Sequence, residues 1–207
     1  MDEADRERLE QQVRALCAQG DHSAAATAIV RDYGPEILGF LMATHRDPVE
    51  ANEAFSEVAE GVWRGLPRFG WESSVRTWTY AIARNVSRFR KRSAARGGKR
   101  VMNATDSFFQ GVVHKVRTET TPFLRTEKKT RLQALRDALP DEDRMLLVLR
   151  VDRGLPWTDV ARIVGHDEEA PPRSDAAIAQ EAARLRKRFQ LVKDRLRELA
   201  KREGLTE

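Results

Sequence analysis

The stretch from residue 63 to residue 92 combines a helical pattern with concentrated positive charge. Large apolar residues recur there every three or four positions, which predicts a helix with one buried face. This face comprises Val75, Trp78, Ile82, Val86 and Phe89. A second ladder, which we expect to meet a partner, comprises Arg76, Tyr80, Arg84 and Arg88. Ser73 or Ser74 precedes the helix and suits its cap, because a serine hydroxyl accepts hydrogen bonds from free N–H groups.

The charge balance around this helix points to a polyanionic partner. Residues 61–100 hold eleven Lys or Arg residues and one acidic residue, Glu72. A surface that needs only solubility mixes both signs, because like charges repel each other. Phe69 and Trp71 lie in a loop just before the helix, beside the helix breakers Pro67 and Gly70. Aromatic rings stack on unpaired bases and cations neutralise phosphates, so the pattern favours single-stranded nucleic acid.

Composition limits the other possibilities. With 207 residues, 41% hydrophobic and 33% charged, a net charge of +5 and a pI near 9.6, the chain fits one or two globular domains that bind nucleic acid. Strand patterns are nearly absent, which predicts an all-α fold. The single cysteine, Cys17, excludes an intramolecular disulfide, and the four histidines lack metal-ligand spacing, so we expect no cofactor. Neither a signal peptide nor a membrane helix is evident, and we expect a cytoplasmic protein.

Fixed positions in this stretch resemble the second conserved region of extracytoplasmic-function (ECF) sigma factors, the small promoter-recognition subunits of bacterial RNA polymerase. The matching segments are WRGLPRF (63–69), ESSVRTW (72–78) and IARN (82–85). The resemblance implies that this stretch captures flipped bases of the −10 element, while Arg84, Arg88, Arg90 and Arg92 neutralise phosphates. The residues assigned to this role are Phe69, Trp71, Ser73, Ser74, Arg76, Tyr80, Arg84, Asn85, Arg88 and Arg92.

The first sixty residues are acidic and helical, with thirteen Asp or Glu and five Arg. We predict helices over 5–18 and 22–32, another that opens at 33–35 (Tyr-Gly-Pro), and a fourth that starts at 47–48 (Asp-Pro) and ends near Trp63. The fourth helix carries an acidic ladder, Glu50, Glu53, Glu57 and Glu60, which is either solvated surface or a docking face. The resemblance implies docking on core RNA polymerase through Glu53, Glu57 and Trp63.

The remainder of the chain predicts a linker and a second domain. Residues 96–130 are rich in Gly, Ser and Thr, with one short apolar segment at 108–113 that could dock. Residues 131–207 show a helix–turn–helix order with the small residue Ala161 and the turn residue Gly165. They resemble the fourth conserved region of sigma factors, which reads the −35 element, but carry an insert at 166–175. The residues assigned to −35 binding are Arg173, Ser174, Ala177, Gln180, Arg184 and Lys187.

We therefore predict an all-α protein of two small helical domains, 1–95 and 131–207, joined by a flexible linker over 96–130. The resemblance implies an ECF sigma factor, which is not itself an enzyme, with core RNA polymerase and promoter DNA as partners. An anti-sigma protein is a further partner that the family allows. The alternative is a free-standing regulator that binds duplex DNA and dimerises through a C-terminal heptad pattern. Its seam would comprise Ile178, Ala182, Leu185, Phe189, Val192, Leu196 and Leu199.

Overall fold

The computed structural model describes residues 1–94, 107–126, 131–166 and 173–204. Within these ranges every regular element is a helix, so the all-α prediction is confirmed. The chain divides into two compact units, Met1–Leu124 and Arg125–Glu207. The predicted domains are 1–95 and 131–207, with a linker between them, whereas this division places the boundary after Leu124.

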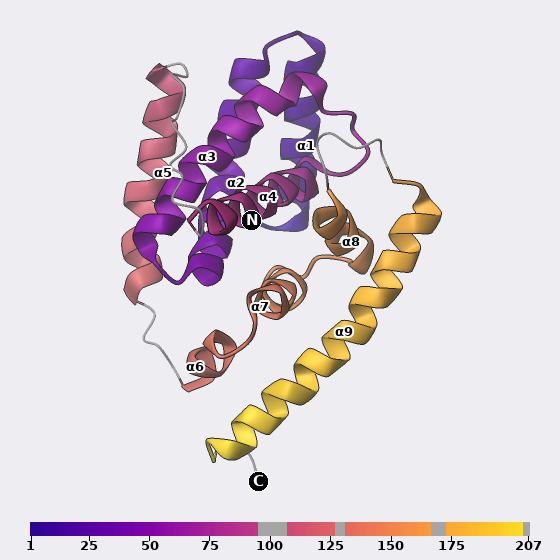
Figure 1. Cartoon of the computed structure of the whole chain (residues 1–207). Coiled ribbons are helices and arrows are strands. Elements are labelled where there is room, and N and C mark those ends of the chain that lie inside the picture. The colour runs from indigo at the N-terminus through magenta and orange to yellow at the C-terminus, as the bar shows by residue number, and fades with distance from the viewer. Residues whose placement is uncertain (95–106, 127–130, 167–172, 205–207) are drawn as a thin grey trace. The chain divides into compact units, whose positions relative to one another are not determined.

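The first unit is built around one long helix (Figure 1). Helix α2 (His22–His45) packs against α1 (Glu3–Ala18), α3 (Pro48–Gly65) and α4 (Val75–Ala94). A short 3₁₀ turn, η1 (Leu66–Arg68), links α3 to the loop before α4. Alanines and large apolar residues of α2 are almost fully buried, including Ala25, Ile29, Leu38, Phe40 and Leu41. Contact with three helices at once requires an apolar surface nearly all round α2, as observed.

Local signals set most helix starts in this unit. Asp2 and Asp5 form a capping box at α1, and Asp47 accepts a hydrogen bond from the backbone N–H of Val49, with Pro48 in the first turn of α3. Ser74 caps α4 by accepting from the N–H of Thr77 at 3.0 Å, which confirms one of the two predicted caps. These caps satisfy N–H groups that a first turn leaves free.

The predicted break at 33–35 is wrong, because α2 runs straight through Pro35. A proline inside a helix removes one backbone hydrogen bond, so surrounding packing must offset that loss. Tyr33 is 1% exposed, and a Cβ added to Gly34 would lie 3.2 Å from the ring of Phe55 and 3.0 Å from Val116. The glycine therefore serves a close helix approach, whereas the sequence pattern indicated a turn.

Part of the predicted linker is a helix, α5 (Ser107–Thr126), that lies beside α3 (Figure 1). Phe109, Val113 and Val116 on one face are 1%, 3% and 7% exposed. Arg117 donates hydrogen bonds to Asn52 and Ser56 of α3. The expected docked apolar segment is thus present, within a longer helix than the sequence indicated. The rest of the predicted linker, 96–106 and 127–130, lies outside the described residues.

The second unit contains four α-helices in its described part, namely α6 (Arg131–Asp137), α7 (Asp141–Leu147), α8 (Trp157–Gly165) and α9 (Asp175–Arg202). A π-helical turn, η2 (Val148–Asp152), extends α7, and Gly154 ends it with a φ of 65°, a conformation that favours glycine. Helix α9 packs against α6, α7 and α8. This arrangement agrees with the predicted helix–turn–helix order.

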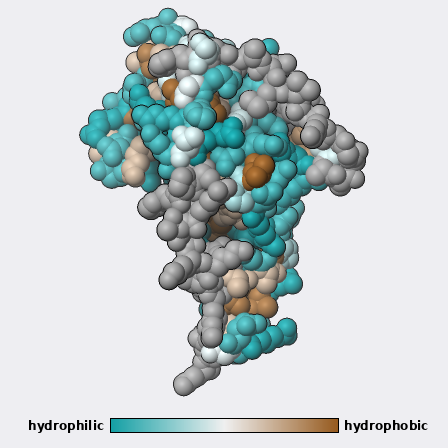
Figure 2. Space-filling view, turned by 90° about the vertical axis from the view of Figure 1, so that its left-hand side faces the viewer, coloured by the Kyte–Doolittle hydropathy of each residue, from teal (hydrophilic) through white to brown (hydrophobic). Residues whose placement is uncertain are grey.

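Few large hydrophobic side chains reach the surface of the described residues. The exposed ones are Met1, Val49, Phe89, Val151 and Leu191. Figure 2 shows one face, on which hydrophilic residues predominate among the coloured residues. Across the described ranges, the helices are too short or too polar to traverse a lipid bilayer.

Candidate nucleic-acid interface

Three aromatic rings form a column at the start of α4, in which Phe69 stacks on Trp78 and is tilted by 47° against Trp71. The Phe69 ring lies 4.6 Å from that of Trp78, at an interplanar angle of 24°, and 4.8 Å from that of Trp71. Trp78 is buried, whereas Phe69 and Trp71 are half-buried. Trp71 has a φ of 58°, which costs a non-glycine residue about 1–2 kcal/mol. Two rings of the column, those of Phe69 and Trp71, are therefore partly accessible to solvent, on a loop whose backbone is left-handed at Trp71.

Helix α1 holds this loop from outside. The carboxylate of Glu10 accepts hydrogen bonds from the backbone N–H groups of Val75 (3.0 Å) and Arg76 (3.3 Å), the first two residues of α4. The guanidinium of Arg14 lies 4.3 Å from the centroid of the Trp71 ring. Sequence reasoning missed Glu10 and Arg14, because no local spacing links them to a loop some sixty residues further on.

The ladder that we expected to face a partner is largely buried. The exposed fractions of Arg76, Tyr80 and Arg84 are 8%, 0% and 6%. Glu36 of α2 accepts hydrogen bonds from Nε of Arg76 (3.0 Å) and from the hydroxyl of Tyr80 (2.7 Å), and it also pairs with Nη2 of Arg76. Burial lowers the pKa of Arg76, but the hydrogen bond to Glu36 and the charge of that carboxylate together outweigh this effect, and the pKa is raised. Helix α4 is therefore covered by α2 as well as by α3, which the periodicity could not reveal.

The exposed arginines lie at the other end of α4. Arg88 and Arg92 are exposed, and Asn85 is half-buried. At 1.5 Å per residue, Arg88 lies about 20 Å along the helix axis from Val75. Phe89, which we predicted to be buried, is 48% exposed. The side chain that follows Val86 on the face towards α3 is that of Arg90, which pairs with acids of α3. The described surface thus offers aromatic rings at one end of α4 and cations at the other.

Arg90 does not face solvent. Its guanidinium donates to Glu50 at 2.8 Å and to Glu53 at 2.6 Å, and it also pairs with Glu57. Burial lowers the pKa of Arg90, but the hydrogen bonds to these three carboxylates outweigh it and raise the pKa. The expectation that Arg90 neutralises phosphates is therefore corrected, since this cation ties α4 to α3.

The residues assigned to polymerase docking differ in exposure. The side chain of Glu53 is 55% exposed, whereas that of Glu57 is 5% exposed beneath Arg90. Trp63 is half-buried, with its ring 4.7 Å from the ring of Phe109 on α5. Glu60 pairs with Arg64 at 2.7 Å, within α3. The acidic ladder is therefore mainly internal structure, and Glu50 and Glu53 remain its accessible part.

The assigned −35 residues lie just before α9 and along its first half. Ser174 caps this helix by accepting from the N–H of Ala177 at 3.3 Å. Gln180 and Lys187 are exposed, as is Arg173. Arg184 is also exposed but pairs with Glu181 at 2.6 Å. Of the insert at 166–175, residues 167–172 lie outside the described residues.

The apolar face of α9 is used within its own unit. Ile178, Ala182, Leu185 and Val192 are buried. Leu139 and Leu147 form a cluster with Val192, against which Phe189 and Leu196 pack. The ring of Phe189 also lies 5.4 Å from that of Trp157 on α8. The heptad pattern therefore reflects packing on α6, α7 and α8, and a coiled-coil dimer would have to give up these contacts.

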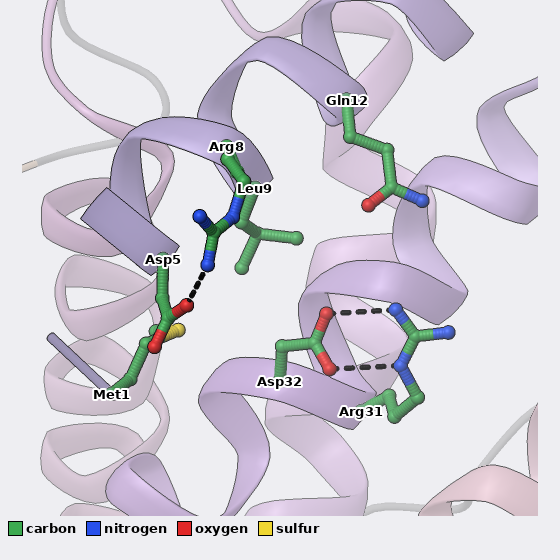
Figure 3. A pocket seen from close by; sticks show the side chains of 7 residues that line it. All are labelled: Met1, Asp5, Arg8, Leu9, Gln12, Arg31 and Asp32. Atoms are coloured by element: carbon green, nitrogen blue, oxygen red, sulfur yellow. Dashed lines mark hydrogen bonds and ion pairs between the residues drawn. The ribbon is translucent and has the colours of Figure 1, made fainter. Parts of the chain in front are cut away.

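A hollow between α1 and α2 has balanced charge and does not add to the interface. Figure 3 shows that each of its two arginines faces an acid: Arg8 pairs with Asp5, and Arg31 pairs with Asp32 through two bonds of 2.8 Å. Nowhere in the described ranges do three or more His, Cys, Asp or Glu side chains gather as they would around a metal ion.

Comparison with known proteins gives two matches. Residues 29–97 match the family model for sigma-70 region 2. This segment spans α3, the aromatic loop and α4, and it includes every position on which the resemblance in the first half of the chain rests. The chain is also 27% identical over 161 residues to the RNA polymerase sigma-H factor of Pseudomonas aeruginosa, covering 75% of this chain and 82% of that protein.

Proposed function

We propose that this chain is an ECF-type sigma factor, because residues 29–97 match the family model for sigma-70 region 2 and the chain is similar to an RNA polymerase sigma factor over 161 residues. In this role the chain binds core RNA polymerase, directs it to promoters and assists melting, without catalysing a reaction itself. The observation that carries the proposal is the half-open aromatic column on the loop before α4, within the matched segment.

The first unit would hold the melted non-template strand of the −10 element. Phe69 and Trp71 offer rings on which an unstacked base can lie, and stacking is worth about 1–3 kcal/mol per base. Flipping a base costs a few kcal/mol, so further contacts must contribute. Arg88 and Arg92 supply charge about 20 Å and about 26 Å along α4 from its first residue, a span of roughly six to eight nucleotides at about 3.4 Å each.

Some of the residues that the sequence assigned to −10 binding are proposed to position α4 and its loop and not to contact DNA. Arg76 and Tyr80 bind Glu36 in the interior and so fix the axial rotation of α4. Ser74 caps the helix, which places the preceding loop. Direct DNA contact is therefore proposed for Phe69, Trp71, Ser73 and Asn85, which are half-buried, and for Arg88 and Arg92, which are exposed.

Docking on core polymerase is proposed for the accessible acids of α3, with Glu53 as the principal contact and Glu50 beside it. Trp63 would take part only where α5 leaves its ring accessible. The second unit is proposed to bind the −35 element through three exposed residues, Arg173 just before α9 and Gln180 and Lys187 along its first half, with Ser174 capping its first turn. An anti-sigma protein remains a candidate partner on family grounds.

The DNA arm of the proposal is tested with the double variant Arg88→Ala/Arg92→Ala in polymerase reconstituted with the full chain. Binding to promoter DNA should weaken on all promoters, and the dependence of log K on log[salt] should become shallower by about 1.4, because each phosphate contact on a single strand contributes about 0.7. The matched control is Arg195→Ala/Arg202→Ala on the distal part of α9, which also removes two cations. An unchanged salt dependence in the Arg88/Arg92 variant would show that these residues do not touch phosphate.

The second candidate, a free-standing dimeric regulator, has little to support it. Its dimer seam on α9 is already packed against the rest of the unit. Sedimentation velocity of the purified chain distinguishes the two: the sigma proposal requires no dimer, whereas the regulator requires a dimer that binds duplex DNA tightly without polymerase.

A further inference from the structure

Helix α1 lies outside the segment that matches sigma-70 region 2, yet it makes two contacts with the proposed −10 site. Glu10 and Arg14 are four residues apart, so they project from the same side of the helix. Glu10 holds the first two N–H groups of α4, and Arg14 lies over Trp71. One face of α1 therefore contacts both ends of the segment 71–76, which contains the strained Trp71.

The position of Arg14 is informative because the guanidinium is planar and charged. It lies 4.3 Å from the centroid of Trp71, while Trp71 lies 4.8 Å from Phe69, and Phe69 lies 4.6 Å from Trp78. The guanidinium thus covers the Trp71 ring at the kind of position that a stacked base would take. A base added to Trp71 on that face would have to take the place of the guanidinium.

Arg14 can leave this position at little cost. It is exposed, and cation–π contacts at exposed sites are weak. An arginine that gives way to a nucleotide also remains next to that nucleotide's phosphate, and arginine binds phosphate oxygens through two parallel hydrogen bonds. Glu10, one turn earlier, keeps α1 attached to α4 through backbone contacts that do not involve Arg14.

We propose that Arg14 of α1 belongs to the single-stranded DNA site: it covers the outer face of Trp71 in the free protein and pairs with the phosphate of the nucleotide whose base replaces it. Glu10 is the positioning residue that keeps α1 and the loop together during this exchange. This inference rests on the proposed function, and it extends the site beyond residues 29–97.

The test uses the full chain reconstituted with core polymerase, and a fork DNA that is single-stranded over the −10 element of a promoter defined by mapping RNA 5′ ends with the wild-type chain. Arg14→Ala should weaken fork binding about 3- to 10-fold and reduce the slope of log K against log[salt] by about 0.7, because one phosphate contact is lost. Arg14→Lys should retain the slope, because it keeps the charge. It should lose part of the affinity, because an ammonium group cannot form the two parallel hydrogen bonds that a planar guanidinium makes with phosphate.

The matched control is Arg8→Ala, on the same helix, where the exposed Arg8 pairs with Asp5 and does not contact the loop. Both alanine variants should bind core polymerase as the wild type does. If Arg14→Ala behaves like Arg8→Ala on the fork, or binds the fork more tightly than the wild type, Arg14 does not contact phosphate and the inference is overturned. A wild-type chain that binds no core polymerase or defines no start refutes the proposed function and removes the inference with it.

Discussion

Removing the carboxylate of Glu36 should be among the most damaging single changes in the first unit. This carboxylate faces Arg76 and Tyr80, and the side chains of Arg76 and Glu36 are 10% and 17% exposed. In Glu36→Ala the guanidinium stays buried without this counter-charge, and breaking such a pair costs about 3–5 kcal/mol. Because small domains are stable by only about 5–15 kcal/mol, the variant should lose a large fraction of its free energy of unfolding.

The measurement is equilibrium unfolding in urea, followed by fluorescence of Trp63, Trp71 and Trp78, which all lie in the first unit. The urea midpoint of Glu36→Ala should fall by an amount equivalent to about 4 kcal/mol, with little change in the slope of the transition. A control at an exposed pair is Glu3→Ala, where Glu3 is 79% exposed beside Arg6, and it should lose less than about 1 kcal/mol.

A triple variant separates the buried charge from general loss of packing. Replacing the three partners together, as Glu36→Leu/Arg76→Met/Tyr80→Phe, removes the charges and the hydroxyl but keeps apolar volume. Buried ion pairs can often be exchanged for apolar residues at little cost, so this variant should regain most of the stability. If Glu36→Ala lies within about 1 kcal/mol of the wild type, or if the triple variant is no more stable than Glu36→Ala, the reasoning about the buried charge is wrong.

Three further predictions concern other contacts of the first unit. Phe109→Ala should destabilise it by about 3–5 kcal/mol and make Trp63 more accessible to acrylamide quenching; unchanged quenching would show that α5 does not cover this ring. Arg90→Ala should lower the free energy of unfolding in urea by about 3 kcal/mol, since it removes the cation that pairs with the buried Glu57. A change near zero would show that this ion pair does not hold α3 and α4 together. Burial raises the pKa of the Cys17 thiol, because it disfavours the charged thiolate. The stability that the neutral thiol contributes is therefore present below the pKa of an unfolded thiol and is lost as pH rises through the raised pKa. Alkylation of Cys17 by iodoacetamide should therefore titrate at higher pH in the native chain than in urea, and coincident profiles would refute this.

Short-range signals predicted much of the fold. Helical spacing identified the buried face through Val75, Trp78, Ile82 and Val86, and local chemistry identified the caps Asp47 and Ser74. These predictions succeed because caps and amphipathic faces depend on residues a few positions apart.

Long-range contacts were beyond the sequence pattern. Glu36 and Glu10 lie about forty and sixty-five residues from the groups they bind, so no spacing rule pairs them with Arg76. The ladder of Arg76, Tyr80 and Arg84 looked like a polar face because its buried acceptor belongs to another helix. Likewise, Pro35 looked like a helix start, although packing around α2 keeps it inside one continuous helix.

Reconstituted transcription tests the central claim most directly. Core polymerase from the source organism is incubated with fragmented genomic DNA, with and without this chain, and RNA 5′ ends are mapped. The account predicts new starts that appear only with the chain and share two upstream sequence elements at a fixed spacing. Core polymerase that binds the chain yet gains no new starts, or a chain that does not bind core polymerase at all, would contradict the account.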